Sequence, residues 1–532
     1  MSSPPEKPKS TRREFLAGVA GAIVGLAVGA AAGSAAFPRK ITETVTQTAT
    51  QTIERTATAT VTQTVTQKVE VKPWLPEKWD EEHEIVIIGS GFAGLSAAIE
   101  AYDNGVKDVV ILEKMPSYGG NSIINGGQMA VLSPEEGDSV DLFVRDMYVA
   151  GHYLNDLELC RKVASESRDA FNWLVSFGVE FPPELKIQAG GHSVRRTYQT
   201  KNITGRDIVV KLVEQVNKRG IPIRLEHKVT RIIREGLREG KVLGVEVEAK
   251  GKKIYIRARR ALIIASGGFS RDIALRKAQW PLLDESFNST NHPGATGEVL
   301  LAAEAIGAML IQMDQIQLYP FAEPYTGVLD RPAVIPFTSP AYAIYVDKKG
   351  RRFVNELAPR DVCANVQIFV VKEKPTFTIF DDAMWPKFTT ADVMKEGLEK
   401  GRIIKGNTLE ELAMKAGIDP AGLVETVKRY NSFVEKGVDE DFGKPKMLAK
   451  IETPPFYAIP QWPAVHHTMG GIRINTRAQV LDVNGNPIPK LYAAGEATGG
   501  VHGGTRLGSV AVTDCIVFGR MAGREAAKEP LD

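Results

Sequence analysis

One continuous stretch, residues 83–114, constrains the fold more strongly than any other part of the chain. It reads HEIVIIGSGFAGLSAAIEAYDNGVKDVVILEK: an apolar strand, a turn with Gly89, Gly91 and Gly94, a helical pattern, and a second strand that ends at Glu113. Glycines allow a tight turn, and the helix beyond it offers free N–H groups to a pyrophosphate. A carboxylate at the tip of the next strand can bond both ribose hydroxyls. The stretch predicts a Rossmann-like α/β domain that binds a dinucleotide; a glycine-rich turn without a ligand is the alternative.

Further glycine-rich passages decide between the two common dinucleotides. MPSYGGNSIINGGQMA follows Glu113 directly, ALIIASGGF spans residues 261–269, and LYAAGEATGGVHGGTRLG begins at residue 491. Several separated passages that converge on one ligand suit FAD, which is long and stays bound, better than a nicotinamide cofactor that must enter and leave. We therefore predict non-covalently bound FAD.

Size and composition exclude several other classes of protein. A chain of 532 residues, 43% hydrophobic and 24% charged, can build more than one core. A net charge of +2 does not favour binding to nucleic acid. The three cysteines, Cys160, Cys363 and Cys515, are far apart, so they predict neither a disulfide framework nor a zinc or iron–sulfur site. No CxxCH motif is present, and we expect no haem on this chain.

The N-terminal region has the features of an export signal followed by a stalk. Within residues 1–37, Arg12 and Arg13 stand directly before a long uncharged run, which is typical of a twin-arginine export signal. We expect export to the periplasm or another extracytoplasmic space; cleavage and retention as a membrane anchor both stay open. Residues 38–82 are rich in threonine and low in complexity, which predicts an extended stalk, with a helical oligomerising stalk as the alternative.

Eight motifs in one order carry a resemblance to a known family: GSGFAG, EKMPSYGGN, GGHSVRRT, ASGGFSRD, NHPGATGE, GRRFVNELAPRD, HHTMGG and AAGEATGGVHGGTRLG. Residues 84–526 resemble the soluble fumarate reductase family, the flavoprotein part of flavocytochrome c, which is related to the flavoprotein subunits of succinate dehydrogenase and fumarate reductase. The resemblance implies an FAD-binding domain at 83–314 and 460–528 that is interrupted by an α+β capping domain at 315–459.

The resemblance also implies roles for single residues. His467 and Arg506 would hold a substrate carboxylate, Arg360 would donate a proton, and reduced FAD would deliver hydride from N5 to an activated C=C bond. We expect no metal at His466 and His467, because neighbours in an extended segment point to opposite sides; a purely structural role for either histidine stays open. The predicted cofactor contacts are Gly89, Gly91, Ala93, Gly94, Glu113, Lys114, Asn121, Ser122, Gly126, Gly127, Val229, Glu298, Glu496, Ala511 and Val512.

The chain departs from the family where a second carboxylate would bind. Fumarate reductases have a histidine in a QxHP motif, but QLYP places Tyr319 there, and their Thr-Glu pair falls on Ile335 and Pro336. A relay arginine falls on Ser339, which leaves the proton route to Arg360 open. Apolar and aromatic residues are frequent in this segment: Tyr319, Phe321, Tyr325, Ile335, Phe337 and Tyr342.

These departures favour an unsaturated carboxylate other than fumarate. Tyr319 resembles the residue of urocanate reductases, so we expect an aryl or heteroaryl acrylate that contacts Tyr319. The alternatives are a fumarate reductase proper, a flavin-dependent ketosteroid-type dehydrogenase, and a flavin-bearing electron carrier without catalysis. With neither haem nor cluster expected on the chain, the electrons would come from a separate donor, a cytochrome c or a quinol-linked membrane protein.

Overall fold

The structure is a computed structural model that describes residues 44–50, 62–68 and 74–532. It divides into two units, Met1–Lys78 and Trp79–Asp532. In the first, β1 (Thr44–Thr50) pairs antiparallel with β2 (Thr62–Lys68), so both segments are extended rather than helical. Threonine is β-branched and favours strands. The predicted signal at 1–37 and the rest of the threonine-rich segment up to residue 73 lie outside the described residues.

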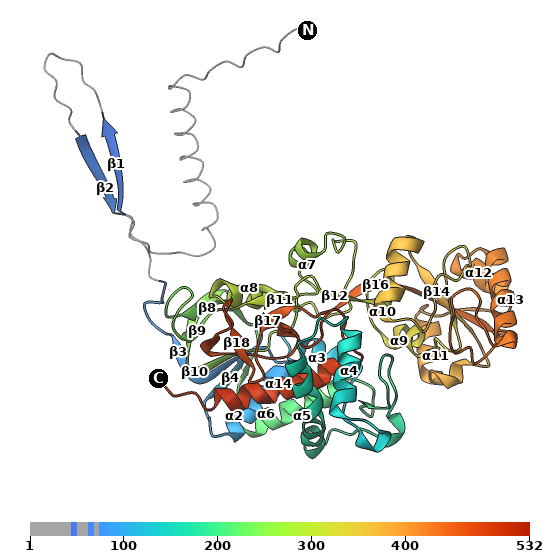
Figure 1. The fold of residues 1–532 in the computed structure, drawn as a ribbon, viewed down its shortest axis with the longest axis horizontal. Coiled ribbons are helices and arrows are strands. Elements are labelled where there is room, and N and C mark those ends of the chain that lie inside the picture. Colours follow the sequence, from blue (N-terminus) through green and yellow to red (C-terminus); the bar gives the residue numbers. More distant parts are fainter. Residues whose placement is uncertain (1–43, 51–61, 69–73) are drawn as a thin grey trace, which may run out of the picture. The chain divides into compact units, whose positions relative to one another are not determined.

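The second unit is built on an eight-stranded sheet (Figure 1). Its central strands are parallel and run in the order β19 (Pro487–Ala493), β10 (Lys252–Ile264), β3 (Glu81–Ile88), β4 (Val109–Leu112) and β7 (Ile223–Arg224). The edge strands β18 (Gln479–Leu481), β8 (His227–Arg234) and β9 (Val242–Ala249) are antiparallel. Val109–Leu112 and the second half of β3 are buried throughout, as expected for parallel strands covered on both faces.

Helices cover this sheet, and two of them pack unusually closely. A Cβ at Gly519 or Gly523 of α14 (Val510–Ala526) would lie 2.5 or 2.3 Å from the carbonyl oxygens of Ala93 and Ala97 of α2 (Phe92–Asp103). The two glycines therefore allow α14 to lie against the backbone of the nucleotide-binding helix. The other elements of this part are α3 (Gly120–Ile124), α4 (Val140–Ala150), α5 (Leu157–Ser176), α6 (Arg206–Lys218), α7 (Ile273–Gln279), α8 (Glu298–Ala305), β5 (Gln128–Ala130), β6 (Thr197–Gln199), β11 (Leu310–Ile311), β17 (Gly471–Arg473), β20 (Thr498–Gly499), η1 (Pro134–Glu136), η2 (Pro183–Leu185) and η5 (Gly495–Ala497).

The part of the unit predicted to form the cap has its own antiparallel sheet. The order is β12 (Ile316–Ala322), β16 (Phe456–Thr468), β14 (Thr376–Asp381) and β13 (Ile344–Val346), with β15 (Ile404–Gly406) also paired to β16. Its buried core lies between this sheet and the helices, and includes Phe377, Ile379, Leu412, Leu423 and Val427. The helical elements are α9 (Arg331–Thr338), α10 (Arg360–Val366), η3 (Gln367–Val371), η4 (Trp385–Lys387), α11 (Ala391–Glu399), α12 (Leu409–Ala416) and α13 (Pro420–Lys436).

Side-chain caps fix where the cap helices begin. The carboxylate of Asp330 accepts a hydrogen bond from the N–H of Ala333 at the start of α9, and Thr408 and Asp419 cap α12 and α13 in the same way. Gly437, in the left-handed conformation, ends α13.

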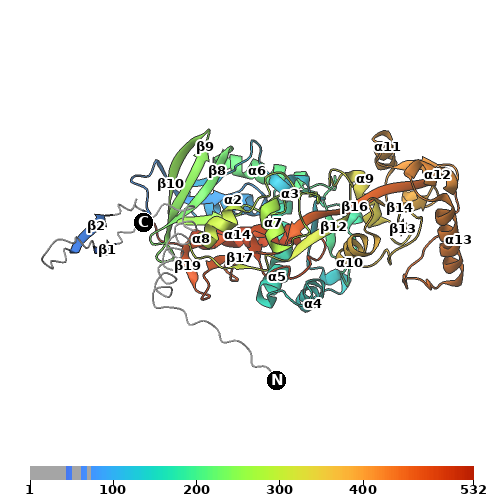
Figure 2. The ribbon, with the colours of Figure 1, turned by 90° about the horizontal axis from the view of Figure 1, so that it is seen from above.

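The long strand β16 belongs to the sheet of the cap and extends beyond it. It continues through residues 459 and 460, where the sequence places a domain boundary, and ends at Thr468. Together with β12 it runs from the cap into the larger part, as the two views show (Figures 1 and 2). The two histidines near the end of β16 therefore lie where the two parts of the unit meet.

Candidate active site

The turn after β3 has the geometry that a pyrophosphate requires. Gly89 has a φ of 104°, and a Cβ there would lie 2.3 Å from the carbonyl oxygen of Ala265. A Cβ at Gly94 would lie 2.0 Å from the carbonyl oxygen of Gly89. Helix α2 begins at Phe92 with Gly91 as its N-cap; the N–H of Phe92 donates to the hydroxyl of Ser122 (2.9 Å), and no cap side chain accepts from the N–H groups that follow. The backbone is thus free to approach an anionic ligand closely.

The predicted acid Glu113 lies just beyond β4 and is held in place by three donors. Its carboxylate accepts hydrogen bonds from the hydroxyl of Ser90 (2.5 Å) and from the N–H groups of Ser90 (3.2 Å) and Met115 (2.9 Å). Ser90, Glu113 and Met115 all line a single cavity. Glu113 is therefore oriented at the cavity wall where the ribose of a dinucleotide would lie.

Most of the predicted cofactor contacts line that cavity. They are Gly89, Gly91, Ala93, Glu113, Lys114, Asn121, Ser122, Val229, Glu298 and Glu496. The remaining five, Gly94, Gly126, Gly127, Ala511 and Val512, are not in its lining. Gly94 shapes the turn instead, and Gly127 packs against Thr200 and Thr204. Contact of these five residues with FAD stays a prediction.

The cavity also has walls that sequence reasoning did not assign. The turn after β10 contributes Ala265, Ser266 and Gly267, and further residues come from three distant segments: His292, Gly294, Ala295, Ala494, Gly495 and Cys515. The glycines of the ASGGF and NHPGATGE motifs could have pointed to these residues, because glycines allow close approach of the backbone to a ligand. The long, bent lining drawn from several glycine turns fits FAD.

Arg506 precedes α14 and is 9% exposed. Its guanidinium donates to the carbonyl oxygen of Leu507 (3.2 Å) and to Oε1 of Gln317 on β12 (3.3 Å), and lies 3.5 Å from Nε2 of His466. Burial and the neighbouring Arg360 lower the pKa of Arg506 to about 9. Arg506 thus lies in a pocket that strongly disfavours an isolated positive charge.

The two histidines of β16 face different neighbours. His466 lies beside Arg506, with its Nδ1 2.7 Å from the hydroxyl of Thr290 and its ring 5.3 Å from that of Tyr319. His467, predicted to join Arg506, instead has its Nδ1 3.6 Å from Oε1 of Glu496. The structure therefore brings His466, not His467, against the predicted carboxylate-binding arginine. Contact between His467 and the substrate stays a prediction.

A β-bulge explains this arrangement. Gln317 of β12 pairs with His467, but the next residue, Leu318, pairs with Val465. His466 is the extra residue between them, and a bulge redirects a side chain relative to simple alternation. The motif HHTMGG does not reveal the bulge, so the sequence could not tell which histidine faces the arginine.

Arg360 begins α10 in the cap and lies between aromatic rings. Its guanidinium carbon is 4.2 Å from the ring centre of Phe337 and 5.5 Å from that of Tyr319. Burial lowers the pKa of Arg360. Within residues 74–532, neither Arg360 nor Arg506 has a carboxylate oxygen within ion-pair distance. The site thus holds two guanidinium groups without an anionic partner from the described chain.

The predicted aromatic half of the site is only partly assembled around Arg360. Tyr319 and Phe337 contact it, and the Tyr319 hydroxyl donates to the carbonyl oxygen of Ala333 (3.2 Å). The other residues of the segment have different surroundings. Phe321 packs between Tyr319 and Tyr345, Ile335 belongs to the cap core, and Tyr342 packs against Phe388 with the rings tilted. Tyr325 is 69% exposed.

Comparison with known proteins places the chain in a family. A family model described as an FAD binding domain matches residues 84–512. The chain belongs to this family. It is 37% identical over 473 residues to the acrylate reductase flavoprotein subunit of Shewanella woodyi, which covers 84% of this chain and 92% of that protein. It is 36% identical over 472 residues to the urocanate reductase of Eggerthella lenta, covering 86% and 76%.

A solved structure supports the same placement. The open conformation of a flavocytochrome c3 fumarate reductase matches with a TM-score of 0.73 at 32% identity, covering 87% of this chain and 84% of that one. The predicted family and the α/β fold with a Rossmann-like FAD-binding domain are confirmed. The chain is an FAD-dependent oxidoreductase that acts on CH–CH bonds. Non-covalent attachment of FAD stays a prediction.

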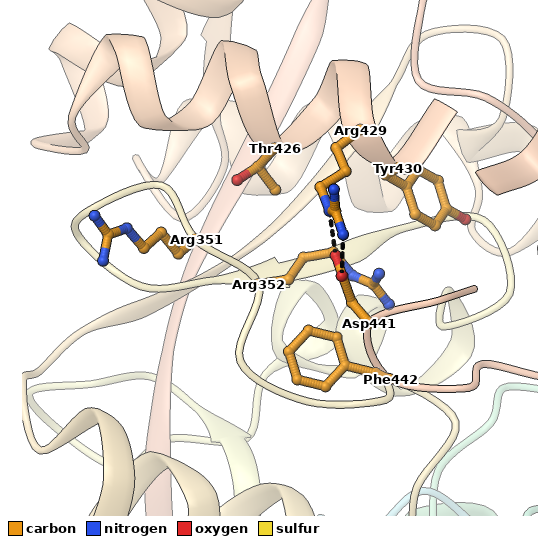
Figure 3. A pocket seen from close by; sticks show the side chains of 7 residues that line it. All are labelled: Arg351, Arg352, Thr426, Arg429, Tyr430, Asp441 and Phe442. Atoms are coloured by element: carbon orange, nitrogen blue, oxygen red, sulfur yellow. Dashed lines mark hydrogen bonds and ion pairs between the residues drawn. The ribbon is translucent and has the colours of Figure 1, made fainter. Parts of the chain in front are cut away.

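A second hollow lies in the cap and differs in character (Figure 3). It is lined by Arg351, Arg352, Thr426, Arg429, Tyr430, Asp441 and Phe442. Arg429 donates two hydrogen bonds to Asp441 (2.8 and 2.6 Å), and Arg352 donates to both Glu356 and Asp439. These arginines have carboxylate partners, unlike those of the candidate site. Among the described residues no group of three or more His, Cys, Asp or Glu could hold a metal, and no helix is long and apolar enough to cross a membrane.

Replacing Gly94 with alanine tests the nucleotide turn. Because the new Cβ would overlap the carbonyl oxygen of Gly89, we expect a strain of about 1 to 3 kcal/mol and FAD binding weakened by about ten-fold to hundred-fold. The measurement is the ratio of flavin to protein absorbance after dialysis, with the circular dichroism spectrum as a check on folding. Gly190→Ala is the matched control, since no atom lies within 4 Å of its Cβ position and the residue is not among the predicted cofactor contacts. Full FAD content in the Gly94 variant would contradict this account of the turn.

Proposed function

We propose that this protein is an exported FAD-dependent reductase of the C=C bond of an α,β-unsaturated monocarboxylate, with aryl and heteroaryl acrylates such as urocanate as the favoured substrates. The observation that carries the proposal is a pair of guanidinium groups, those of the buried Arg506 and the partly buried Arg360, without a carboxylate within ion-pair distance. A buried unpaired charge is costly, and a bound anion removes that cost.

Arg506 is suited to bind the substrate carboxylate. A planar guanidinium can donate two parallel hydrogen bonds to a carboxylate, which fixes both position and orientation. Gln317 and the carbonyl of Leu507 already hold the side chain in place. His466 lies at its side, so we assign to His466 the additional donor that the sequence assigned to His467. Burial and the two arginines lower the pKa of His466, which keeps the ring neutral.

Arg360 is suited to donate a proton. Burial lowers its pKa, so the proton is less tightly held than on a solvated arginine. Phe337 and Tyr319 cover the guanidinium with aromatic rings and exclude water from its faces. When bound, reduced FAD supplies the hydride. Arg360 would then protonate the neighbouring carbon, and Arg506 would stabilise negative charge that develops on the carboxylate.

The side of the site around Arg360 favours an apolar substituent on the substrate. Tyr319 uses its hydroxyl on the backbone of Ala333, so it presents its ring rather than a free hydrogen-bond donor. Ile335, where a fumarate reductase has threonine, is buried in the cap core. No second carboxylate clamp is therefore formed by these residues. Fumarate stays the first alternative; a ketosteroid-type dehydrogenase is the second, and it would retain activity in Arg506→Ala.

A panel of unsaturated acids tests the substrate class. The protein is reduced with dithionite without air, and the rate of flavin reoxidation is followed after addition of fumarate, acrylate, crotonate, methacrylate, cinnamate or urocanate. We expect cinnamate or urocanate to exceed fumarate by at least about ten-fold in kcat/KM, since Arg360 is assigned to proton donation and Tyr319 and Ile335 beside it offer no donor to a second carboxylate. A preference for fumarate over every aromatic acid would refute the assigned specificity. Reoxidation by none of them would refute the reductase.

Arg360→Ala tests the proton donor. Loss of a general acid typically reduces turnover by about 10² to 10⁴-fold, and we expect kcat to fall by at least this much while FAD stays bound. Stopped-flow reoxidation with the preferred acid measures it. Arg331→Ala, which removes an exposed arginine of the same domain, is the control and should keep wild-type turnover. Turnover within a few-fold of wild type in the Arg360 variant would exclude its role as the acid.

Location and electron supply form the last part of the proposal. The support for export by the twin-arginine route is the Arg12-Arg13 pair before an uncharged run. We expect that changing both arginines to lysine leaves the flavoprotein in the cytoplasm, as measured by cell fractionation; unchanged export would refute this route. The expected electron donor is a separate cytochrome c or quinol-linked membrane protein. Rapid direct oxidation of NADH by the purified protein would contradict that expectation.

A further inference from the structure

Four titratable side chains form a row that begins at the wall of the flavin cavity. Glu496, in η5, lines the cavity, and its Oε1 lies 3.6 Å from Nδ1 of His467. The ring of His467 meets that of His502 edge to face at 5.2 Å. Nε2 of His502 lies 3.4 Å from Oδ2 of Asp514 on α14. The proposed reduction of a C=C bond uses none of the last three residues.

The row is buried, and part of its hydrogen-bonding capacity is unused. His467, His502 and Asp514 are 6%, 4% and 2% exposed. Nε2 of His467, Nε2 of His502 and Oδ1 of Asp514 have no hydrogen-bond partner. Buried polar atoms are normally satisfied, and an unsatisfied one calls for a functional or structural reason. The row can therefore accept a further proton without displacing an existing hydrogen bond of these three atoms.

The surroundings distinguish the members of the row. Burial lowers the pKa of His467 well below the usual value, and His502, Arg506 and His466 act in the same direction. Burial raises the pKa of Glu496, although its oxygens accept hydrogen bonds from the N–H of Thr468 and the side-chain amide of Asn121. Cys160 on α5 and Cys515 on α14 flank Asp514, and burial raises the pKa of both thiols, which keeps them neutral. His502, like His467, has a carboxylate beside it, but Arg506 acts on His467 and lowers its pKa.

We propose that His502 takes up a proton upon two-electron reduction of the bound FAD, with Asp514 as the counter-ion of the resulting imidazolium. Reduction adds negative charge to the cofactor, and a positive charge on an imidazole that is linked to the cavity wall through His467 and Glu496 offsets it. The electrons come from an external reductant. One proton accompanies them to the cofactor, and a second bonds to a ring nitrogen of His502. His467 connects this site to Glu496 at the cavity wall.

The inference rests on FAD as the bound group and is independent of the substrate. Its test is a spectroscopic redox titration of the holoenzyme without substrate, repeated across a range of pH. In the wild type, the slope of the midpoint potential against pH should correspond to two protons for two electrons over part of the range. In His502→Gln and Asp514→Asn we expect one proton for two electrons over that same part.

His192→Gln is the matched control. This histidine is also buried, but its Nε2 lies 2.8 Å from the carbonyl oxygen of Gly508, outside the row, so the slope should stay as in the wild type. A wild-type slope of one proton at every pH would overturn the proposal, as would variants that keep the second proton. If the variants do not hold FAD, the reduced-minus-oxidised infrared difference spectrum of wild-type protein with isotope-labelled histidine decides. The proposal requires an imidazolium signal there, and its absence overturns it.

The two proposals fail in different ways. A panel in which no unsaturated acid reoxidises the flavin would refute the proposed reductase and leave the pH slope of the potential unchanged. A slope of one proton would refute the role of His502 and leave the preference among the acids unchanged.

Discussion

The candidate site depends on two guanidinium groups, those of Arg506 and Arg360, that have no carboxylate of the described chain within ion-pair distance. Arg352 in the cap shows the contrast: burial acts against its charge, yet hydrogen bonds to Glu356 and Asp439 raise its pKa above the usual value. Arg506 and Arg360 lack such partners, and burial lowers their pKa. A ligand carboxylate would supply to these two arginines the partner that the fold itself supplies to Arg352.

The fold brings these groups together from three separate segments. Arg506 comes from the loop before α14, His466 from the bulge near the end of β16, and Arg360 from the first turn of α10. The ladder between β12 and β16 links the cap to the larger part, and Gln317 of β12 bonds the Arg506 side chain directly. The cap therefore contributes to the orientation of Arg506 and also provides Arg360.

The nucleotide half of the molecule could be predicted from sequence because it is built from local signals. A strand, a glycine turn, a helix and an acid within residues 83–114 specify both the fold and the position of Glu113. The substrate half depends on long-range packing. His466 faces Arg506 because of a bulge, and Ile335 and Tyr342 point into the cap, where they pack against residues distant in sequence. Neither the bulge nor this packing can be recognised in the local pattern of residues.

The two adjacent histidines of β16 lie beside side chains of opposite charge. His466 contacts the cationic side of the site, where a substrate carboxylate would bind, whereas His467 contacts Glu496 at the wall of the flavin cavity. The bulge at His466 places the two side chains against these different neighbours. Arg506 and Glu496 still act on each other through the buried site, where Arg506 opposes the effect of burial on the pKa of Glu496. A neutral imidazole on each side can donate or accept a hydrogen bond without adding charge. The HHTMGG motif therefore places one histidine beside Arg506 and the other beside Glu496.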